Sequence, residues 1–397
     1  MDNIRILIIN PWQGIIGPNI GFLQLAGEGI RRGHDMHALC PVRDEIAEQA
    51  RRAGASIHVD GRLIPTQRDL SAKGIVRHAI IAAKQLQCTL EAMRRIRPAV
   101  ACINSESVLS GPLAARIARV PAAVYVRGAR FDQLRLLARA YFGFQAMAKP
   151  TYIAVSNFVG ERLVRFGVSR ASVRIIPNGV DLGRFRPEPA DPGFAAEYGV
   201  GAMRKLIGAV CHLTPRKGVH HLVEIMSLLR DRLPEAGCLV AGSAHVPEYA
   251  AALGARIREY GLEGRMRLIG EQKDIVRFIA AMDIMIHPSG TESFGRVIAE
   301  SMAMGKPVIA FATGAVPELI RHGETGFIVR PFDCEQGASY AATLLNDPGL
   351  QRRMGESAVA FAHRHFDLAG SIGPAMDLLE SLAARRAFPN TDTQACA

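Results

Sequence analysis

The sequence predicts an α/β protein of two Rossmann-like domains, each a doubly wound parallel sheet, that face one another across a cleft. Short apolar or β-branched runs alternate with helix-length amphipathic stretches from end to end. The expected strands are apolar throughout rather than alternating, as a parallel sheet covered on both faces requires. A proline-rich stretch at 186–193 interrupts this pattern, and a fresh strand begins near Leu206. Strand-helix alternation then implies right-handed crossovers within each half.

The individual elements follow from these runs. The expected strands are Arg5–Asn10, Met36–Cys40, Ala99–Asn104, Ala122–Arg127, Thr151–Ser156, Val173–Pro177, Lys205–Cys211, Gly237–Gly242, Met266–Gly270, Ile284–Pro288, Pro307–Phe311 and Gly326–Arg330. Helical patterns fill the gaps between them, for example Phe22–Arg32, Ile75–Arg97, Val219–Arg232 and Phe294–Met304.

The domain boundaries are expected from the same pattern. An N-terminal domain covers 1–185, a linker covers 186–199, and a C-terminal domain covers 200–365. A terminal apolar helix at 366–386 has no partner strand of its own, so we expect it to return to the N-terminal domain. Residues 387–397 are expected to form a loose tail.

Composition narrows the class of protein. Of 397 residues, 49% are hydrophobic and 21% are charged, as in a folded globular protein. No apolar run approaches the roughly 20 residues of a membrane span, and the N-terminus leads straight into Arg5 and a short apolar strand without the small-residue cleavage site of a secretory signal. We therefore expect a cytoplasmic protein. The cysteines are scattered, with no Cys-x-x-Cys spacing, and are expected to be buried apolar side chains rather than metal or disulfide ligands.

The formal charge of +11 indicates anionic partners. Zinc-finger spacing, aromatic nucleic-acid signatures and a basic low-complexity tail are all missing from the sequence, which argues against nucleic acid. Phosphorylated ligands and an anionic membrane surface are the partners that remain.

The most informative stretch runs from His287 to Pro307. Here a strand is followed by a small-residue loop and by a helix that starts near Phe294-Gly295. Glu292 lies in the loop and Glu300 in the helix, which at ~1.5 Å rise per residue is too far apart for both to act on one atom. They can instead hold opposite ends of an elongated ligand, with the helix N-terminus between them. A sugar–diphosphate–ribose fits, because hydroxyls favour carboxylates and a diphosphate favours backbone N–H groups.

These residues resemble a known family. Pro-Ser-x-x-Glu-x-Phe-Gly, followed by Glu-x-Met-Ala-x-Gly-Lys-Pro-Val, is similar to the family 4 retaining glycosyltransferases of GT-B fold (glycosyl transferases group 1). The resemblance extends over most of the chain through further motifs in the same order, which are Arg32-Gly33-His34-Asp35, Ile176-Pro177-Asn178-Gly179-Val180-Asp181, Leu213-Thr214-Pro215-Arg216-Lys217-Gly218, Leu268-Ile269-Gly270, Ala281-Met282-Asp283 and Gly323-Glu324-Thr325-Gly326-Phe327.

The resemblance assigns roles to the C-terminal domain, which would bind the nucleotide sugar. Glu300 would bind the ribose hydroxyls, and Glu292 would contact the donor sugar as a catalytic residue without acting as a nucleophile. Lys217 would neutralise the charge on the departing phosphate. The backbone of Phe294 and Gly295 would join the sugar contacts, and the N–H groups around Arg296 and Val297 would reach the diphosphate.

Two residues depart from the family pattern. His212 stands where the family usually has an arginine, and it is interpreted either as a phosphate ligand or as a structural substitution, with Arg216 as a compensating phosphate contact. In the N-terminal, acceptor-side domain the chain reads Val126-Arg127-Gly128, where many members have a His-Gly pair. Arg127 cannot act as a base, but it can bind a phosphate or an acidic acceptor.

The loop 13–21 follows the first strand and contains Gly14, Gly17 and Gly21. Its spacing is not Gly-x-Gly-x-x-Gly, so it lacks a dinucleotide fingerprint. We expect it to line the sugar and acceptor side of the cleft, and a plain turn is the alternative.

The segment Arg127–Phe144 combines Arg130, Arg135 and Arg139 with aromatic and leucine side chains. This pattern is typical of a helix on an anionic membrane surface, and it also describes an ordinary amphipathic helix with a solvated basic edge.

The expected function is therefore a hexosyltransferase that moves a sugar from a UDP- or GDP-sugar to a glycan or lipid-linked acceptor in bacterial polysaccharide, lipopolysaccharide or glycolipid synthesis. No cofactor is expected, and the lack of Asp-x-Asp or a P-loop favours a metal-independent reaction. A nucleotide-sugar epimerase of the same fold and a non-catalytic sugar-nucleotide-binding protein are the alternatives. We expect a cytoplasmic enzyme with peripheral contact at the inner face of the membrane.

Overall fold

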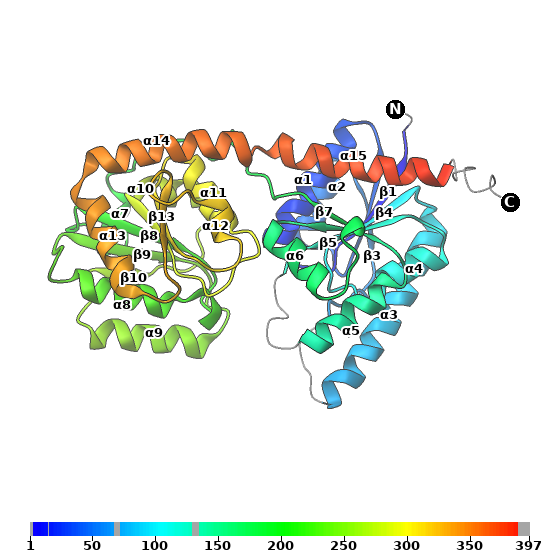
Figure 1. Ribbon diagram of the computed structural model, residues 1–397, viewed down its shortest axis with the longest axis horizontal. Coiled ribbons are helices and arrows are strands. Elements are labelled where there is room, and N and C mark those ends of the chain that lie inside the picture. The colour runs from blue at the N-terminus through cyan, green and yellow to red at the C-terminus, as the bar shows by residue number, and fades with distance from the viewer. Residues whose placement is uncertain (1–2, 15, 67–71, 129–134, 388–397) are drawn as a thin grey trace. The chain divides into compact units, whose positions relative to one another are not determined.

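The chain forms two compact units in the computed structural model, which describes residues 3–14, 16–66, 72–128 and 135–387 (Figure 1). The first unit comprises Met1–Gly179 together with Ala369–Ala397, and the second comprises Val180–Leu368. The chain thus changes units just after Gly179 and again just after Leu368. Each unit contains a parallel sheet with helices on both faces.

The first unit contains a seven-stranded sheet in the order β3-β2-β1-β4-β5-β6-β7. Its strands are β1 (Arg5–Ile9), β2 (Asp35–Cys40), β3 (Ser56–Val59), β4 (Val100–Ile103), β5 (Ala122–Val126), β6 (Thr151–Ala154) and β7 (Val173–Ile175). Strand β3 was not expected from the sequence. It is an edge strand with exposed Ser56 and Val59, so it lacks the continuous apolar run that marks the central strands.

Helices of the first unit follow the strands in alternation. They are α1 (Gly17–Arg31), α2 (Glu45–Arg52), α3 (Ala72–Ile96), α4 (Gly111–Ile117), α5 (Arg135–Ala146), α6 (Asn157–Arg165) and the terminal α15 (Leu368–Ala387). Helix α1 begins at Gly17-Pro18, where the fixed φ of proline suits the first turn.

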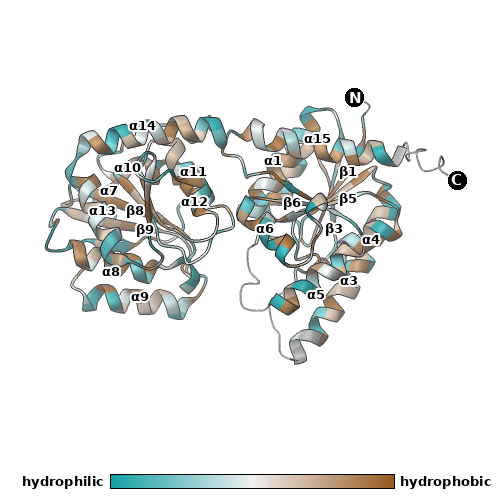
Figure 2. Cartoon of the chain, in the orientation of Figure 1, coloured by the Kyte–Doolittle hydropathy of each residue, from teal (hydrophilic) through white to brown (hydrophobic). Residues whose placement is uncertain are grey.

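The second unit contains a six-stranded sheet in the order β10-β9-β8-β11-β12-β13. Its strands are β8 (Lys205–Val210), β9 (Ala236–Ala241), β10 (Met266–Leu268), β11 (Ile284–His287), β12 (Val308–Phe311) and β13 (Gly326–Val329). Every paired strand in this sheet is parallel. The strands carry the hydrophobic colours in Figure 2, whereas hydrophilic residues gather on the helices.

Helices of the second unit are α7 (Phe194–Glu197), α8 (Val219–Leu229), α9 (Pro247–Glu259), α10 (Ile275–Ala281), α11 (Arg296–Ala303), α12 (Val316–Leu319), α13 (Cys334–Asn346) and α14 (Pro348–His365). The strands and the inner faces of α8 and α13 form one buried apolar cluster. Burial of this continuous cluster supplies the main driving force for folding the unit.

The segment 186–199, which we expected as a linker, lies within the second unit. Phe194 is buried at the start of α7, with its ring 6.1 Å from that of Phe278 on α10. Arg277 of α10 donates to Asp191 at 2.5 Å and also binds Glu197. These partners lie about eighty residues away in sequence, so the proline-rich composition of the segment did not reveal them.

Helix α15 packs on the first unit, although it follows the second in sequence. Arg32, just after α1, donates to Asp377 at 2.6 Å and to Glu380 at 3.1 Å. His34 Nε2 lies 2.8 Å from the same Glu380 carboxylate. Across the described helices, none is both long enough and apolar enough to cross a bilayer.

Candidate functional site

The second unit has a topological switch point between β8 and β11. Strand β8 comes first in this sheet but lies in its middle, with β9 on one side and β11 on the other. In open α/β sheets, ligands bind outside the carboxyl ends of the strands where the order reverses in this way. The loops that leave β8 and β11 at this edge carry Lys217 and Glu292 respectively.

The turn that carries Lys217 is pressed against the loop after β11. Gly218, with φ +69°, ends the turn and caps α8, and a Cβ there would lie 1.9 Å from the carbonyl oxygen of Pro288. The Gly290 N–H donates to the Arg216 carbonyl at 2.9 Å. The Arg216 side chain in turn donates from Nη1 to the Thr291 carbonyl at 3.1 Å. The backbone therefore fixes the position of Lys217 relative to the Glu292 loop.

A second contact holds the Glu292 loop from the side of β12. The Ala315 N–H donates to the Glu292 carbonyl at 2.9 Å, and Thr313 Oγ1 donates to the Ser289 carbonyl at 2.7 Å. A Cβ on Gly314 would lie 2.0 Å from the Glu292 carbonyl oxygen. Only a glycine allows the chain after β12 to approach this closely.

The Glu292 carboxylate is the centre of the site. It is only 7% exposed, forms an ion pair with Lys217 Nζ, and lies 2.9 Å from His287 Nε2 through the same oxygen. Burial alone would raise its pKa, but the positive charge of Lys217 and the hydrogen bond from His287 lower it well below 4.5. Glu292 is therefore an ionised hydrogen-bond acceptor at neutral pH, as contact with sugar hydroxyls requires.

Helix α11 starts directly beside this carboxylate in sequence. Gly295 is its N-cap with φ +95°, and the helix begins at Arg296. The first N–H groups of a helix have no partner within it and carry partial positive charge, which favours an anion at this end. The Phe294 side chain is buried with its ring 5.8 Å from that of Phe366, so it anchors the loop from within the core.

Glu300 lies one turn into α11. Its side chain is only 9% exposed, and Arg296 Nη2 donates to it at 3.3 Å across that turn. Val297 occupies the second helical position beside Arg296. The structure thus places Glu292, Phe294, Gly295, Arg296, Val297 and Glu300 on one continuous loop-helix corner, as the sequence predicted.

His212 lies at the carboxyl end of β8. Its Nδ1 is 2.9 Å from Ser243 Oγ, and its ring centroid is 4.3 Å from that of His245, both residues of the loop after β9. Burial lowers the pKa of His212 below 6.5, and the charges of His245 and Lys217 lower it further. At neutral pH His212 is therefore an uncharged imidazole that can offer a hydrogen bond but no net charge.

The first unit has its own switch point, between β1 and β4. Buried Asn10 and Asn104 end these two strands and are joined by a 2.9 Å hydrogen bond. Arg127, at the end of β5, donates from Nη2 to Asn104 and from Nη1 to Asn178, both at 2.9 Å. The guanidinium lies against Gly21 of α1, where a Cβ would be 2.7 Å from it.

The other two glycines of the loop after β1 belong to a tightly tied turn. Gly14 has φ +71°, its N–H donates to Asp44 at 2.8 Å, and its carbonyl accepts from Asn19 at 2.6 Å. Gly17 is the first residue of α1. Arg127 and Gly21 are therefore in direct contact, while Gly14 and Gly17 set the path of the chain into α1.

Two family models match this chain, each over a different range of residues. Residues 17–184 match the family model described as Glycosyltransferase Family 4, and residues 194–360 match the one described as Glycosyl transferases group 1. The chain belongs to glycosyltransferase family 4. Together the two matches include β2–β13 and every candidate site residue except Gly14.

Curated relatives of this family 4 chain act on different substrates. The N-acetyl-alpha-D-glucosaminyl L-malate synthase of Bacillus anthracis is 31% identical over 43% of this chain and 44% of its own length. The lipopolysaccharide core biosynthesis mannosyltransferase LpsB of Rhizobium meliloti is 33% identical over 44% of this chain and 50% of its own length. This chain thus aligns with about half the length of the curated relatives it matches.

A solved structure agrees with the fold over nearly the whole chain. The HepE protein of Anabaena, in complex with UDP and glucose, has a TM-score of 0.80 at 24% identity, covering 96% of this chain and 100% of that one. At this level of identity the likeness shows the fold, which is GT-B.

His287 is a site residue that the sequence did not identify. It lies in the stretch that predicted the site, but as the last residue of an apolar strand it read as part of the core. Only the fold of the loop brings its imidazole back onto Glu292, five residues later. Thr313 and Gly314 were missed for a similar reason, because their contacts cross from the neighbouring strand β12.

Proposed function

We propose that this family 4 member transfers a sugar, with retention of configuration, from a UDP- or GDP-sugar to a glycan or lipid-linked acceptor. The observation that carries the proposal is the ion pair of Lys217 with buried Glu292, next to the start of α11, at the switch point of the second sheet. The site offers an ammonium and helix N–H groups for a diphosphate, and carboxylates for hydroxyls. The names of the relatives support the same class of reaction.

The donor would lie along the loop-helix corner. Glu300, one turn into α11, would accept hydrogen bonds from the ribose, while Glu292 accepts them from the donor sugar with the backbone of Phe294 and Gly295. The N–H groups of the first turn, at Arg296 and Val297, would meet the diphosphate between these ends. HepE, a structural neighbour, is known in complex with UDP-glucose, which supports a nucleotide sugar as ligand.

Departure of the nucleoside diphosphate requires charge stabilisation. As the bond from the anomeric carbon to the phosphate oxygen breaks, negative charge builds on the diphosphate, and a fixed cation nearby lowers the barrier. Lys217 would supply that cation, with Arg216 and the uncharged His212 as further hydrogen-bond donors. We propose that these groups, rather than a metal ion, balance the charge.

The first unit would bind the acceptor. Arg127 lies at the carboxyl end of β5, in contact with Gly21 and with the asparagines that end β1 and β4. Arg127 donates to Asn104 and Asn178, and a planar guanidinium at this position suits a phosphate or an acidic group on the acceptor. Gly14 and Gly17 would shape the adjoining loop. The lipopolysaccharide role of LpsB supports a cell-surface glycan or glycolipid as acceptor.

Helix α5 suits contact with an anionic membrane that presents a lipid-linked acceptor at the cytoplasmic face. Leu136 is 84% exposed beside exposed Arg135, and Arg139 follows one turn later. Met147, just after the helix, is 69% exposed. Arg130, Phe131 and Leu134 of the expected basic-aromatic segment lie outside the described residues.

Liposome flotation tests this contact. Anionic vesicles at low salt should carry the wild-type chain upward, and a Leu136→Asp/Met147→Asp variant should float at least tenfold less. The matched control is Val59→Asp/Ile117→Asp, which places the same two charges on residues of β3 and α4 that are 48% and 49% exposed. Equal flotation of all three proteins would remove helix α5 as a membrane contact.

Two variants of the donor site test the proposed reaction. Glu300→Ala should weaken donor binding by about 10- to 100-fold, because one charge-assisted hydrogen bond is lost. Lys217→Ala should lower turnover by about 100- to 1,000-fold with a smaller effect on donor binding. Donor binding is measured by thermal shift with UDP, GDP and ADP, and products by mass spectrometry with a panel of nucleotide sugars and acceptors.

The same assays distinguish a glycosyltransferase from the two alternatives, a nucleotide-sugar epimerase and a non-catalytic binding protein. Turnover of a nucleotide sugar without an acceptor would identify an epimerase. Binding without any product over the whole panel would identify a non-catalytic binding protein. If both variants bind and turn over donors like the wild type, Lys217 and Glu300 are not the donor site. Turnover in the presence of EDTA should equal that in its absence.

A further inference from the structure

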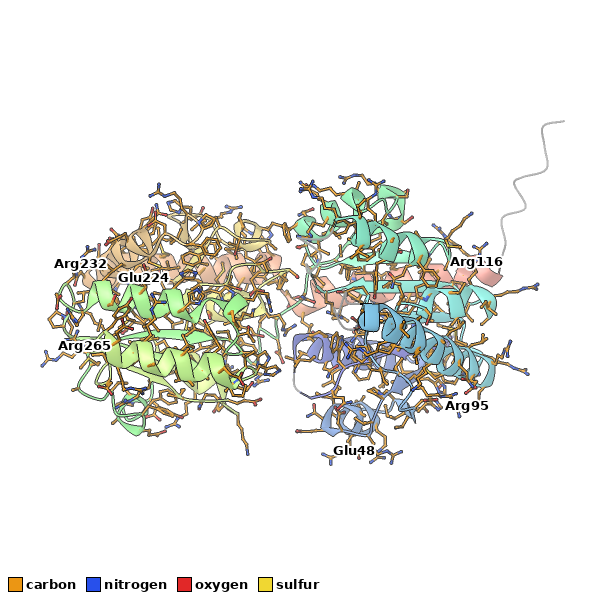
Figure 3. All side chains as sticks on the ribbon, turned by 90° about the horizontal axis from the view of Figure 1, so that it is seen from below. Glu48, Arg95, Arg116, Glu224, Arg232 and Arg265 are labelled. Atoms are coloured by element: carbon orange, nitrogen blue, oxygen red, sulfur yellow. The ribbon has the colours of Figure 1, made fainter. Side chains whose placement is uncertain are left out.

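A cluster of three metal-binding side chains lies on the helices of the second unit. His221 and Glu224 are in the first turns of α8, and Cys334 is the first residue of α13. One potential ligand atom from each lies within 4.8 Å of those of the other two. His221 Nδ1 is 3.8 Å from Cys334 Sγ. Glu224 is labelled in Figure 3, on the same unit as Arg232 and Arg265.

The spacing of these atoms suits a tetrahedral zinc ion. With Zn–S near 2.3 Å and Zn–N near 2.0–2.1 Å, two ligands of a tetrahedral ion are about 3.6 Å apart. The observed separation of sulfur and imidazole nitrogen is therefore within a few tenths of an ångström of the required one. His221 and Glu224 are three residues apart, so they share one face of α8. Glu224 is half-buried, and a carboxylate oxygen of it lies within 4.8 Å of the ligand atoms of His221 and Cys334.

The surroundings fix two of the ligands. Gly337 brings α13 close to α8, since a Cβ there would lie 2.9 Å from Ile225. Cys334 is only 5% exposed and has little freedom to move away from α8. The rings of Phe311 and Phe332 lie 5.5 and 5.3 Å from the imidazole of His221. Such an apolar shell limits the orientations of the imidazole and the access of water.

We propose that His221, Glu224 and Cys334 bind a borderline-soft divalent cation, with Zn²⁺ as the preferred ion and water as the fourth ligand. A thiolate, an imidazole and a carboxylate form a typical zinc donor set, whereas Mg²⁺ and Ca²⁺ prefer oxygen ligands only. Binding of the ion replaces the proton of the Cys334 thiol. In this structure the Cys334 sulfur lies 3.7 Å from the His221 carbonyl oxygen.

The role of this ion would be structural. It would join the first turn of α8 to the first turn of α13, and α8 begins directly after Lys217 and Gly218. The ion would stabilise the second unit without contact with the donor, so this inference stands independently of the proposed function.

Cobalt substitution tests the site directly. The full chain, without a metal-affinity tag, is stripped with a chelator, dialysed and titrated with Co²⁺. The expected result is one equivalent bound, with a sulfur-to-cobalt charge-transfer band in the near ultraviolet, which Zn²⁺ then removes by competition. Zn²⁺ should also raise the melting temperature of the wild-type chain.

Two variants and one control test Cys334 and Glu224 as ligands. Cys334→Ser should abolish the charge-transfer band, and Glu224→Gln should weaken Zn²⁺ binding at least tenfold while sugar transfer stays near wild type. Glu335→Gln removes an exposed carboxylate beside Cys334 and is the matched control, which should bind like the wild type. Lack of the band in the wild type, or its persistence in Cys334→Ser, would overturn the proposal. Equal weakening by Glu224→Gln and Glu335→Gln would exclude Glu224 as a ligand.

Discussion

Glu292 is held from both sides by groups that favour its charged form. Lys217 comes from the loop after β8 and His287 from the end of β11, and both contact the same carboxylate oxygen. Replacing a buried ion pair as a whole can be neutral, but removing one partner leaves a charge without compensation. Glu292 therefore contributes to stability as well as to the proposed contact with the donor sugar.

The change Glu292→Gln should lower the stability of the second unit by roughly 3 kcal/mol near neutral pH, because Lys217 loses its counter-charge. The folded-state pKa of Glu292 is lowered, so its contribution is complete above the ordinary value of 4.5 and is lost as pH falls below that value. The stability difference between wild type and variant should stay constant above about pH 5.5 and shrink in more acidic buffer.

Thermal unfolding over a series of buffers measures this difference. The matched control is Glu335→Gln, an exposed carboxylate of the same unit whose loss should change stability by less than about 1 kcal/mol. A difference that already shrinks between about pH 8 and pH 6 would attribute the effect to the titration of a histidine instead.

His287 acts on the proposed reaction through Glu292 rather than by contact with substrate. It is a positioning residue, buried at the end of β11. We expect His287→Ala to lower kcat about tenfold because the carboxylate can turn away from the donor sugar. His287→Asn should recover part of that loss, because an amide can still donate to Glu292. A purely structural role would lower the melting temperature and leave kcat of the folded fraction unchanged.

At the scale of elements, the site depends on loops that touch through glycines. Gly218 and Gly314 press the turns after β8 and β12 onto the loop that carries Glu292, with backbone oxygens in the space that a Cβ would need. Backbone atoms cannot rotate away as a flexible side chain can. The distance between Lys217 and Glu292 is therefore set by the packing of loops rather than by side-chain conformation alone.

The change Gly218→Ala tests this dependence. The added Cβ would lie 1.9 Å from the Pro288 carbonyl oxygen, which is a severe clash. The positive φ adds about 1–2 kcal/mol of backbone strain. We expect a loss of stability above 2 kcal/mol and a fall in turnover of at least tenfold. Gly323→Ala is the matched control, because φ is +79° there and nothing lies within 4 Å of the added Cβ. It should cost the backbone strain only and leave turnover unchanged, as measured by thermal unfolding and product formation.

Elements whose stability depends on residues within the element itself were predicted well from the sequence. The central strands were expected within one or two residues of their observed ends, since continuous apolar runs are needed to bury both faces. The edge strand β3 was not, because it lacks such a run. The packed segment around α7 was not, because its stability comes from distant partners such as Arg277. The loop-helix corner was predicted because its residues are contiguous, whereas the contact of His287 with Glu292 depends on how the loop folds back.

Cys334 illustrates the same limit for side-chain clusters. Its spacing from the other cysteines indicated an ordinary buried thiol, and it is buried. Its neighbours His221 and Glu224 precede it by more than one hundred residues, since 334 − 221 = 113. Only the packing of α8 against α13 brings the three together.

At the scale of the whole chain, helix α15 belongs to the same unit as strand β1, although the two lie far apart in sequence. Helix α15 contributes buried Met376 and Leu379 to the first unit and places Glu380 against Arg32 and His34. The match to the Glycosyltransferase Family 4 model covers residues 17–184, so the contribution of the terminal helix lies outside that segment of sequence. Folding of the first unit thus depends on both ends of the chain.

Two acidic residues on α15 should differ sharply in how much they contribute to the stability of the first unit. Glu380 is only 10% exposed and is shared by Arg32 and His34, so Glu380→Ala removes the partner of the buried His34 Nε2 and should cost about 2–3 kcal/mol. Asp377 also binds Arg32, at 2.6 Å, but it is 64% exposed, and Asp377→Ala should cost less than about 1 kcal/mol.

Chemical unfolding, monitored by the exchange of amide protons in β1 and β8, measures the stability of each unit separately. The loss in Glu380→Ala should appear in β1 and leave β8 protected as in the wild type, because α15 stabilises the first unit alone; equal losses in both strands would mean that the units unfold together.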